Sequence, residues 1–540
     1  MKVVLIEWRA TKSIQQWGTL GLQYITSALR AEGYAVKLML LEGWDVHESY
    51  KMILENTPDL VGIPIYAETN DKIYEITKLI KQKNKDTIIF TGGHTASLYA
   101  AKIMLENKYI DIVCRGEGEE TVTEMCQTLY RGNSLGDCKG IFYREGSIIY
   151  KNDDRKLIKD LDTIYDPAID LLEDSPKDNP NLFVSVSTSR GCLGRCEFCV
   201  EHRVSKWDGK LEWRGRSPEN ILNEIQNVKN RFPDKRLIIR FVDGAFEDPF
   251  PKNKSRIKRL MDLIEKSNLK LSFSFLTRAE SWKDYDRDLI KKMRKLGLFS
   301  VSVGFESGSS ETLKLLGKRA TMDDNNLVCE LFREEQILVY AFIMMFQPYS
   351  KLDDLYKTAK FLKNRNFAVR PENWTHAMYI YPDTPIYRRA SEDGIITGTD
   401  KSGFMYQYNF CDDKVQNVFN VMSIIAKSKG VNRFQSNIDK IMQEQELVST
   451  WLMQEWELQV IKEIFANFNE QVEYIIQSAG DTQYEIFVGI LNAVRDNKLK
   501  EREIDYINQW DKRLIRFSDR LEQIYLNYKM KVGRKRVRTI

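Results

Sequence analysis

The sequence has little net charge and no long apolar run, and these absences exclude several classes of protein. Lysine and arginine exceed aspartate and glutamate by only four, 81 against 77, in 540 residues. This balance favours neither a protein that coats nucleic acid nor one held on a membrane surface. No apolar stretch reaches the roughly 18 residues needed to span a bilayer. The start, MKVVLIEWRATKS, has no small-residue cleavage site and is interpreted as a first strand, not a signal peptide.

Cysteine is also sparse, and the chain has no convincing internal repeat or long low-complexity tract. Its eight cysteines are spread through the sequence, which fits a reducing cytosol better than a secreted domain held by disulfides. The length allows roughly three or four average domains, or one barrel-sized domain with flanking modules. We therefore expect a cytoplasmic protein with a large buried core.

The first part of the chain alternates short apolar runs with helical patterns. The runs are VVLIEW (3–8), AVKLMLL (35–41), LVGIPIY (60–66), TIIFTGG (87–93) and IDIVC (110–114). This alternation is typical of a parallel sheet with helices on both faces, so we predict a doubly wound, Rossmann-like domain over residues 1–150. A hairpin around Glu145-Gly146 ends this domain, and the charged, proline-containing stretch 151–181 is predicted to be a linker.

A second alternation of strand and helix patterns follows. Its strand-like runs are LFVSVST (182–188), RLIIRFVD (236–243), LKLSFSF (269–275), LFSVSVGF (298–305), ILVYAFIMM (337–345) and WTHAMYIY (374–381). Six such units predict a partial (β/α)6 barrel over residues 182–398, with functional residues on the loops after the strands. Strand signals then fade and apolar residues recur at helical spacing, so residues 399–540 are predicted to form an α-helical C-terminal domain.

Three cysteines follow the first strand of the second alternation, in TSRGCLGRCEFCV. Cys192, Cys196 and Cys199 have the spacing C-x3-C-x2-C. A redox pair needs two sulfurs and a structural zinc usually takes four ligands, whereas three thiolates on a four-iron cluster leave one iron open. A Cys3His zinc site is the alternative, because His202 follows Cys199 by three positions. The spacing and the position after a barrel strand together favour the cluster.

GCLGRCEFC after an opening strand resembles the signature of the radical S-adenosyl-L-methionine (SAM) superfamily, including the aromatic Phe198 before the last cysteine. The resemblance implies a four-iron, four-sulfur (4Fe-4S) cluster whose open iron chelates the amino and carboxylate groups of SAM. It also implies that an electron from a reductant such as flavodoxin or ferredoxin cleaves SAM to methionine and a 5′-deoxyadenosyl radical. The protein then has to orient this radical and exclude competing reactions.

Later segments are similar to successive loops of the radical enzymes that carry a cobalamin domain. They are WRGRSPENILNEI (213–225), IRFVDGAFEDP (239–249), VGFESGSSETLKLLGKRAT (303–321) and YIYPDTPIYRRASEDGI (379–395). By position, the resemblance implies that Glu306 accepts hydrogen bonds from the SAM ribose and that Arg278 meets the methionine carboxylate. The alternative for each is an ion pair at the barrel rim. After the fifth strand, where related enzymes often have a glycine-containing loop, this chain has MMFQPYS (344–350).

The N-terminal domain is similar to the cobalamin-binding domain of the same enzymes. TGGHTAS (91–97) and CRGEGEETV (114–122) each follow a strand and open a helix. Glycines there allow close backbone approach, and the helix N-termini can receive a polar group. The resemblance implies that cobalamin contacts Gly92, Gly93, His94, Gly116, Glu117 and Gly118. Dinucleotide binding is the rival, but RATKSIQQWG follows the first strand where G-x-G-x-x-G would be expected.

WDVHESY (44–50) begins like D-x-H-x-x-G, a motif by which some cobalamin proteins ligate cobalt. Tyr50 replaces the glycine, however, and the segment follows the second strand instead of the first. We therefore expect His47 on a helix surface, and the resemblance implies cobalamin without a histidine lower ligand.

Three other cysteines do not predict a second cluster, because their spacing of twelve residues is far from compact ligand patterns. We expect buried thiols, which commonly behave as small hydrophobes. They are Cys114, Cys126 and Cys138.

The resemblance as a whole implies a cobalamin-dependent radical SAM methyltransferase. It would transfer a methyl group from SAM, through methylcobalamin, to a poorly activated carbon of a peptide or small-molecule natural product. The alternative keeps both cofactors but performs a ring contraction, cyclisation or other redox rearrangement. A non-catalytic corrinoid or iron–sulfur carrier is disfavoured, since the SAM loops would then have no purpose. The basic tail KMKVGRKRVRTI lacks interleaved aromatics, so neither nucleic acid nor a membrane is an expected partner.

Overall fold

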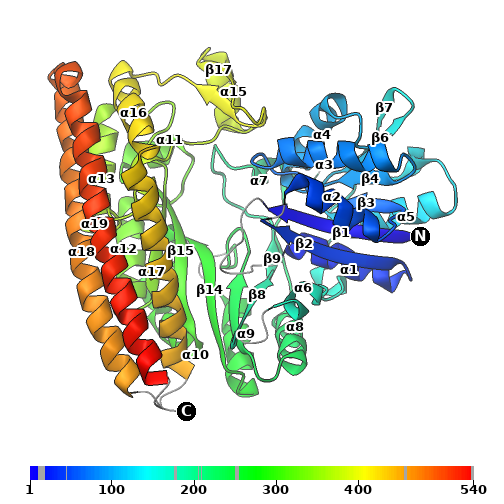
Figure 1. Cartoon of the computed structure of the whole chain (residues 1–540), viewed down its shortest axis with the longest axis horizontal. Coiled ribbons are helices and arrows are strands. Elements are labelled where there is room, and N and C mark those ends of the chain that lie inside the picture. The colour runs from blue at the N-terminus through cyan, green and yellow to red at the C-terminus, as the bar shows by residue number, and fades with distance from the viewer. Residues whose placement is uncertain are drawn as a thin grey trace.

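The computed structural model describes residues 1–9, 19–43, 45–175, 179–204, 206–207, 210–249, 254–454 and 459–536. An N-terminal sheet domain lies beside a central sheet domain, and long C-terminal helices flank the central domain on its other side (Figure 1). None of the helices within these ranges combines the length and apolar character that crossing a membrane requires.

The N-terminal domain is built on a seven-stranded sheet with the order β2-β1-β3-β4-β5-β6-β7. The first five strands are parallel: β1 (Lys2–Arg9), β2 (Ala35–Glu42), β3 (Leu60–Gly62), β4 (Ile88–Thr91) and β5 (Ile112–Cys114). The predicted hairpin adds the antiparallel strands β6 (Ile141–Glu145) and β7 (Ile148–Lys151).

Helices cover both faces of this sheet, which confirms the doubly wound prediction. They are α1 (Leu20–Ala31), α2 (Val46–Glu55), α3 (Asn70–Lys83), α4 (His94–Glu106) and α5 (Gly118–Tyr130). Alternate residues of β1 supply two separate apolar cores: Val4 and Ile6 belong to one, and Val3 and Leu5 to the other. A strand buried on both faces in this way is typical of parallel sheets.

The central domain contains a five-stranded parallel sheet with the order β16-β15-β14-β13-β8. The strands are β8 (Asn181–Val186), β13 (Arg236–Phe241), β14 (Leu271–Arg278), β15 (Leu298–Glu306) and β16 (Leu338–Ile343). The connecting helices include α8 (Pro218–Arg231), α9 (Ser255–Ser267), α10 (Arg287–Leu296), α12 (Met322–Glu334) and α13 (Leu352–Asn364). Five of the six expected strands are therefore present as a partial barrel.

The sixth expected strand, residues 374–381, is not a regular strand. Its start belongs to the short helix α14 (Glu372–Thr375), and beyond it Ala377 and Ile380 form only isolated bridges, with Phe346 and Tyr406 respectively. The physical reason is tertiary packing: the buried Trp374 indole donates to the Ala368 carbonyl at 2.7 Å and contacts rings of the C-terminal helices.

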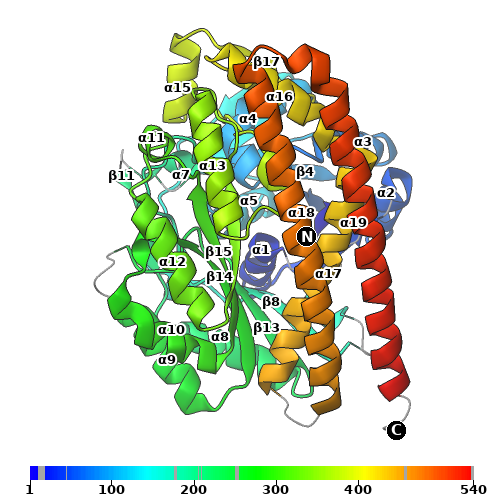
Figure 2. The ribbon, with the colours of Figure 1, turned by 90° about the vertical axis from the view of Figure 1, so that its left-hand side faces the viewer.

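The C-terminal region is helical, as predicted, but only from Asp413 onward, because a strand at Tyr406–Tyr408 lies within the expected range 399–540. It consists of α16 (Asp413–Ala426), α17 (Lys429–Gln454), α18 (Gln459–Arg495) and α19 (Leu499–Arg536). Figures 1 and 2 show α17, α18 and α19 running side by side along the central domain. Gln483 of α18 donates to the Val369 carbonyl at 2.9 Å, and one apolar core runs through the barrel and the helices. The helices therefore share their core with the barrel.

A small hairpin connects the central domain back to the N-terminal domain. It comprises β17 (Ile396–Thr399) and β18 (Tyr406–Tyr408). The amide of Asn70 donates to the Ser402 carbonyl at 2.9 Å, and the Tyr99 hydroxyl donates to the carbonyl of Phe404. The rings of Tyr99 and Phe404 also pack at 4.8 Å between centroids. This contact braces the two domains.

Candidate functional site

Loops after the strands of both sheets line one cavity of about 550 Å³, called here the interdomain cavity. From the N-terminal domain come residues after β1, β3, β4 and β5, and from the central domain come residues after β8 and β13. Ligands of parallel sheets bind at such carboxyl ends. All six residues expected to contact cobalamin line the cavity: Gly92, Gly93, His94, Gly116, Glu117 and Gly118.

The two glycine turns, 92–94 and 116–118, form an open cradle in this wall. Gly93 has φ +94° and Gly116 has φ +74°, values that favour glycine. A Cβ on Gly93 would meet nothing closer than Cβ of Pro64 at 4.0 Å, and one on Gly116 would meet no atom within 4 Å. Helix α4 begins directly after Gly93, and helix α5 begins at Gly118, two residues after Gly116. The cradle fits a large ring cofactor that lies against backbone.

Glu117 also links the two domains, because two arginines of the central domain contact its carboxylate. Arg190 and Arg214 each place a guanidinium nitrogen 3.0 Å from Glu117 Oε1, and the Ile158 N–H donates to Oε2 at 2.6 Å. Burial alone would raise the pKa of Glu117, but the Arg214 hydrogen bond and the two positive charges outweigh it and hold that pKa below its usual range. Arg190 precedes Cys192 by two residues, so this network joins the glycine turns to the cysteines.

The cysteine loop, residues 191–199, follows β8 and the short strand β9 (Ser189–Arg190). Gly191 opens the loop with φ +86°, and a Cβ there would lie 2.0 Å from the Glu212 carbonyl oxygen. The buried Asp243 accepts hydrogen bonds from the N–H groups of Thr188, at 2.8 Å, and Ser189. The strand end before the loop is thereby fixed. Burial raises the pKa of Asp243 to about 6.

The three cysteines of this loop are half-buried thiols. Burial raises the pKa of Cys196 to about 11 and that of Cys199 to about 12, and Lys318 opposes the effect at Cys196. Thiols must lose their protons to bind iron. The described side chains contain no three His, Cys, Asp or Glu groups converging on a single ion. A 4Fe-4S cluster does not require this, since each thiolate binds its own iron. The side chain of His202, the fourth ligand of the zinc alternative, lies outside the described residues.

Glu306 ends β15 in a backbone conformation that is strained for a non-glycine residue, with φ +65°. Its Oε1 lies 3.3 Å from Nζ of Lys318, which also donates to the Gly304 carbonyl at 2.9 Å. Burial would lower the pKa of Lys318, but Glu306, Cys196 and Glu280 together outweigh burial and raise it. Sequence reasoning missed Lys318, whose only signal was its place in the GKRAT stretch.

Arg278 lies at the end of β14 beside the cysteine loop. A Cβ on Gly194 would be 3.6 Å from Arg278 Nη1 and 3.2 Å from Cys192 Sγ. The guanidinium is also paired with Glu280, its Nε lying 3.0 Å from Oε1. The ion-pair alternative is thus present, and it coexists with a position next to Cys192. Both Cys192 and Arg278 line a small cavity of about 60 Å³.

Phe198 packs against a buried apolar cluster at the same end of the barrel, which includes Leu316 and Met344. Two expectations about residues outside the site are confirmed. His47 is exposed on α2. The three equally spaced cysteines are buried: Cys114, Cys126 and Cys138.

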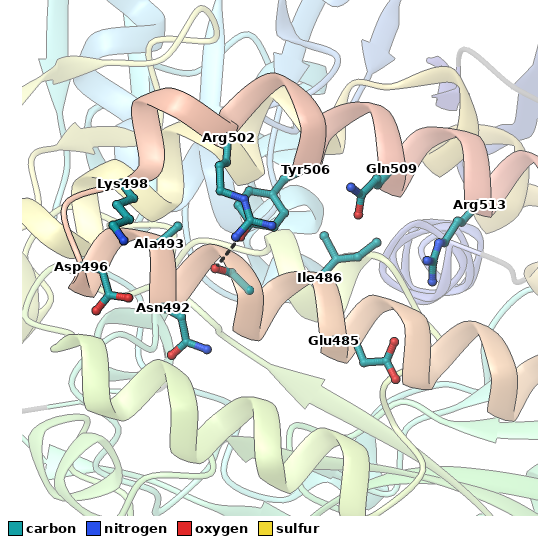
Figure 3. Close-up of a pocket in the computed structure, with 11 residues that line it drawn as sticks. Glu485, Ile486, Asn492, Ala493, Asp496, Lys498, Arg502, Tyr506, Gln509 and Arg513 are labelled. Carbon is teal, nitrogen blue, oxygen red and sulfur yellow. Dashed lines mark hydrogen bonds between the residues drawn. The ribbon is translucent and has the colours of Figure 1, made fainter.

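A further cavity of about 410 Å³ lies between α18 and α19 (Figure 3). Tyr506 donates to the Gly489 carbonyl at 3.0 Å, and the Arg502 guanidinium lies over the Tyr506 ring. Charges of both signs surround it, for example Asp496 and Lys498. None of the residues singled out in the sequence lines this cavity, so the chemistry converges on the interdomain cavity and the cysteine loop.

Two protein families match this chain. Residues 9–125 match the B12 binding domain, and residues 186–362 match the radical SAM superfamily. The first domain implies cobalamin, and the second implies SAM and a 4Fe-4S cluster. The first match covers the glycine turns, and the second covers the cysteine loop together with Glu306 and Lys318.

Among curated proteins, the chain is 32% identical over 305 residues to an uncharacterized methyltransferase of Pyrococcus horikoshii, covering 56% of this chain and 63% of that one. It is 27% identical over 369 residues to 4′-phospho-dehydrooxetanocin synthase of Priestia megaterium, covering 64% and 48%. It is 24% identical over 405 residues to the anaerobic magnesium-protoporphyrin IX monomethyl ester cyclase of Cereibacter sphaeroides, covering 72% and 63%. The chain thus spans less than two thirds of the length of these relatives.

Among solved structures, the cobalamin-dependent SAM radical enzyme OxsB, with aqua-cobalamin and SAM bound, has a TM-score of 0.69 and 20% identity, covering 98% of this chain and 84% of that one. The radical SAM methyltransferase TsrM from Kitasatospora setae, with cobalamin and a 4Fe-4S cluster bound, has a TM-score of 0.58 and 16% identity, covering 76% and 84%. At these identities the likeness establishes the fold.

Proposed function

Because this chain belongs to the radical SAM enzymes that carry a B12 binding domain, we propose that it is a cobalamin-dependent methyltransferase acting on a poorly activated carbon of a small molecule or peptide. One observation carries the proposal: the glycine turns expected to hold cobalamin and the start of the cysteine loop line one cavity. Arg190 and Gly191, directly before Cys192, line the same cavity as the glycine turns. Two reagents that act on one carbon atom must be held in such proximity.

The chain's own residues would divide the work of binding. Cys192, Cys196 and Cys199 would hold the cluster, and the glycine turns would hold cobalamin against the backbone. When bound, the cluster and SAM supply a radical that can remove a hydrogen atom, and cobalamin supplies a carrier for the methyl group. An external reductant would provide the electron.

The charged residues at the barrel rim would position SAM. Glu306 would accept hydrogen bonds from the ribose hydroxyls, and its strained backbone is a cost typical of residues kept for function. Arg278 would attract the methionine carboxylate while Glu280 restrains its guanidinium. The ion pairs of Glu117 would hold the N-terminal domain against the central domain. The glycine turns and the cysteine loop would thereby keep a fixed relative position.

A second candidate function uses the same site but transfers no methyl group to the substrate. It is favoured by the relatives named as a cyclase and as an oxetanocin synthase, which stand beside those named as methyltransferases. In that case the radical would lead to a ring contraction, cyclisation or other redox rearrangement of the substrate. The binding roles proposed above would be unchanged.

The test compares products from methyl-labelled SAM in anaerobically reconstituted holoenzyme with a strong reductant. Even without substrate, a methyltransferase should pass label to the corrinoid and release S-adenosylhomocysteine. With substrate, labelled product, 5′-deoxyadenosine and S-adenosylhomocysteine should appear together. Formation of 5′-deoxyadenosine with neither S-adenosylhomocysteine nor labelled corrinoid would refute methylation and favour the rearrangement.

A further inference from the structure

Lys318 follows a turn that is pressed against the cysteine loop. The preceding Gly317 has φ +65°, and a Cβ on it would lie 2.6 Å from the Arg195 carbonyl oxygen and 3.2 Å from Cγ of Glu197. The Glu197 N–H donates, at 2.9 Å, to the carbonyl two residues before Lys318. Arg195 and Glu197 flank Cys196 on both sides. The turn therefore fixes Lys318 relative to the central cysteine of the loop.

From this turn the Lys318 side chain reaches the end of β15. Its ammonium donates to the Gly304 carbonyl at 2.9 Å and lies 3.3 Å from Oε1 of Glu306, and the side chain is only 4% exposed. Water screens a charge buried to this extent only weakly, so its field acts more strongly than at the surface. One buried cation is thus tied both to the cysteine loop and to the carboxylate expected to bind the SAM ribose.

We propose that Lys318 is a positioning residue that serves both groups of this site: it aims Glu306 at the SAM ribose, and its buried charge stabilises the reduced 4Fe-4S cluster. The inference rests on the proposed function, because it needs both cofactors to bind. Reduction adds one electron from an external reductant to the cluster, and no bond is formed or broken. A fixed positive charge nearby favours that added negative charge and raises the reduction potential.

The competing interpretation is a purely structural ion pair, and the chain contains a matched example. Nζ of Lys254 lies 2.8 Å from Oδ2 of Asp286, with side chains that are 1% and 3% exposed. Lys254 packs over the Trp282 ring instead of beside the cysteine loop. If Lys318 were only structural, its replacement should affect the protein as replacement of Lys254 does, through stability alone.

The experiment is an EPR-monitored redox titration of the cluster in reconstituted full-length protein, with iron and sulfide content measured on each sample. The variants are K318M, K318R, E306Q, the double variant K318M/E306Q, and K254M as the control. The E306Q background is needed because an unpaired Glu306 carboxylate in K318M can take up a proton and cancel the lost charge. SAM affinity is measured on the same samples by calorimetry.

Relative to E306Q, the double variant should lower the ratio of reduced to oxidised cluster at a fixed potential at least tenfold, a shift of about 59 mV for one electron. E306Q alone should shift the potential in the opposite direction. K318M should weaken SAM binding at least tenfold, K318R should restore most of it, and K254M should change neither quantity.

Equal potentials for E306Q and the double variant, at full iron content, would overturn the inference. If the double variant loses its iron, the K318R and E306Q samples test the inference instead. A reduction potential that E306Q does not change would overturn the inference. A SAM affinity that K318R does not restore would overturn it as well. A wild-type protein that binds no cluster, or binds one and yields no 5′-deoxyadenosine, would instead refute the proposed function, and the inference with it.

Discussion

The two parallel sheets present their carboxyl ends to the same cavity but equip them differently. The N-terminal sheet contributes glycine turns and helix N-termini. The central sheet contributes Arg190 and Gly191 to the cavity. Its loops also carry Cys196, Glu306 and the buried Lys318, which do not line the cavity. Glycines let a large group approach the backbone, whereas buried charges hold a charged group in a fixed field. The same strand–helix architecture thus provides space for a large group in the N-terminal domain and fixed charges in the central domain.

Removal of a thiol should have the largest effect, because it takes away a ligand that nothing else replaces. Cys196→Ala is expected to lose essentially all cluster iron and all 5′-deoxyadenosine formation. Cys126→Ala, which removes a buried thiol of the other domain, should keep full iron content. Iron and sulfide analysis after anaerobic reconstitution measures both. Equal iron in the two variants would show that the cysteine loop does not hold the cluster.

A bulky side chain in the glycine turns tests whether the N-terminal domain binds cobalamin through the space that these glycines leave open. Gly93→Leu is expected to weaken cobalamin binding more than 100-fold, because its side chain would project into the cavity. Gly132→Leu is the matched control: Gly132 also has a positive φ, of +68°, but does not line the cavity. Both variants should carry a backbone strain of about 1 to 3 kcal/mol. The visible absorption of bound corrinoid measures cobalamin binding by both variants. An equal loss of binding in the two variants would show that backbone strain alone causes it.

Loss of the Glu117 ion pairs should weaken the contact between the two domains while leaving both sheets folded. Glu117→Gln is expected to lower the free energy of unfolding by about 2 kcal/mol, since it leaves the partly buried Arg214 without its charged partner and leaves Arg190 with Glu119 alone. Glu120→Gln, on the same helix but exposed, should cost about 0.5 kcal/mol or less. Denaturant unfolding gives both values. A Glu117 effect as small as that of Glu120 would mean that the network does not hold the domains together.

The Glu117 contribution should also depend on pH in a defined direction. Its pKa is lowered in the folded protein, so its stabilisation is fully present above the unfolded value of about 4.3. The stabilisation is then lost as the pH falls through the lowered folded pKa. The stability difference between wild type and Glu117→Gln should therefore shrink below about pH 4. A difference that grows on acidification would contradict this assignment.

The smallest expected effect concerns the hairpin that braces the two domains. Tyr99→Phe removes the hydroxyl that donates to the Phe404 carbonyl but keeps the ring contact. One such hydrogen bond contributes about 1 kcal/mol. Hydrogen exchange at residues 396–408 should rise about fivefold while cobalamin affinity stays unchanged. Unchanged exchange would show that the other contacts hold the hairpin without this hydrogen bond.

Much of the fold could be predicted from the sequence because its signals are local. Alternation of apolar runs with helical patterns identified the N-terminal sheet and five of the central strands, and the C-x3-C-x2-C spacing identified the cysteine loop. The sixth strand could not be predicted correctly. Its apolar residues suit a strand, but Trp374 is drawn into a core formed with helices more than 100 residues later. Packing outweighed local propensity there.

By itself, the sequence, through its motifs and its resemblance to a known family, determined which residues are the candidates for the chemistry: the cysteine loop, the glycine turns, and Glu306 at a strand end. The tertiary structure alone decided what stands next to them. Glu117 meets Arg190 and Arg214 across 73 and 97 residues of sequence, and the turn before Lys318 packs against the residues that flank Cys196. Periodicity and spacing act over a few residues, so they specify elements and motifs. The partners of a buried charge depend on how distant elements pack, because only burial makes an unpaired charge costly.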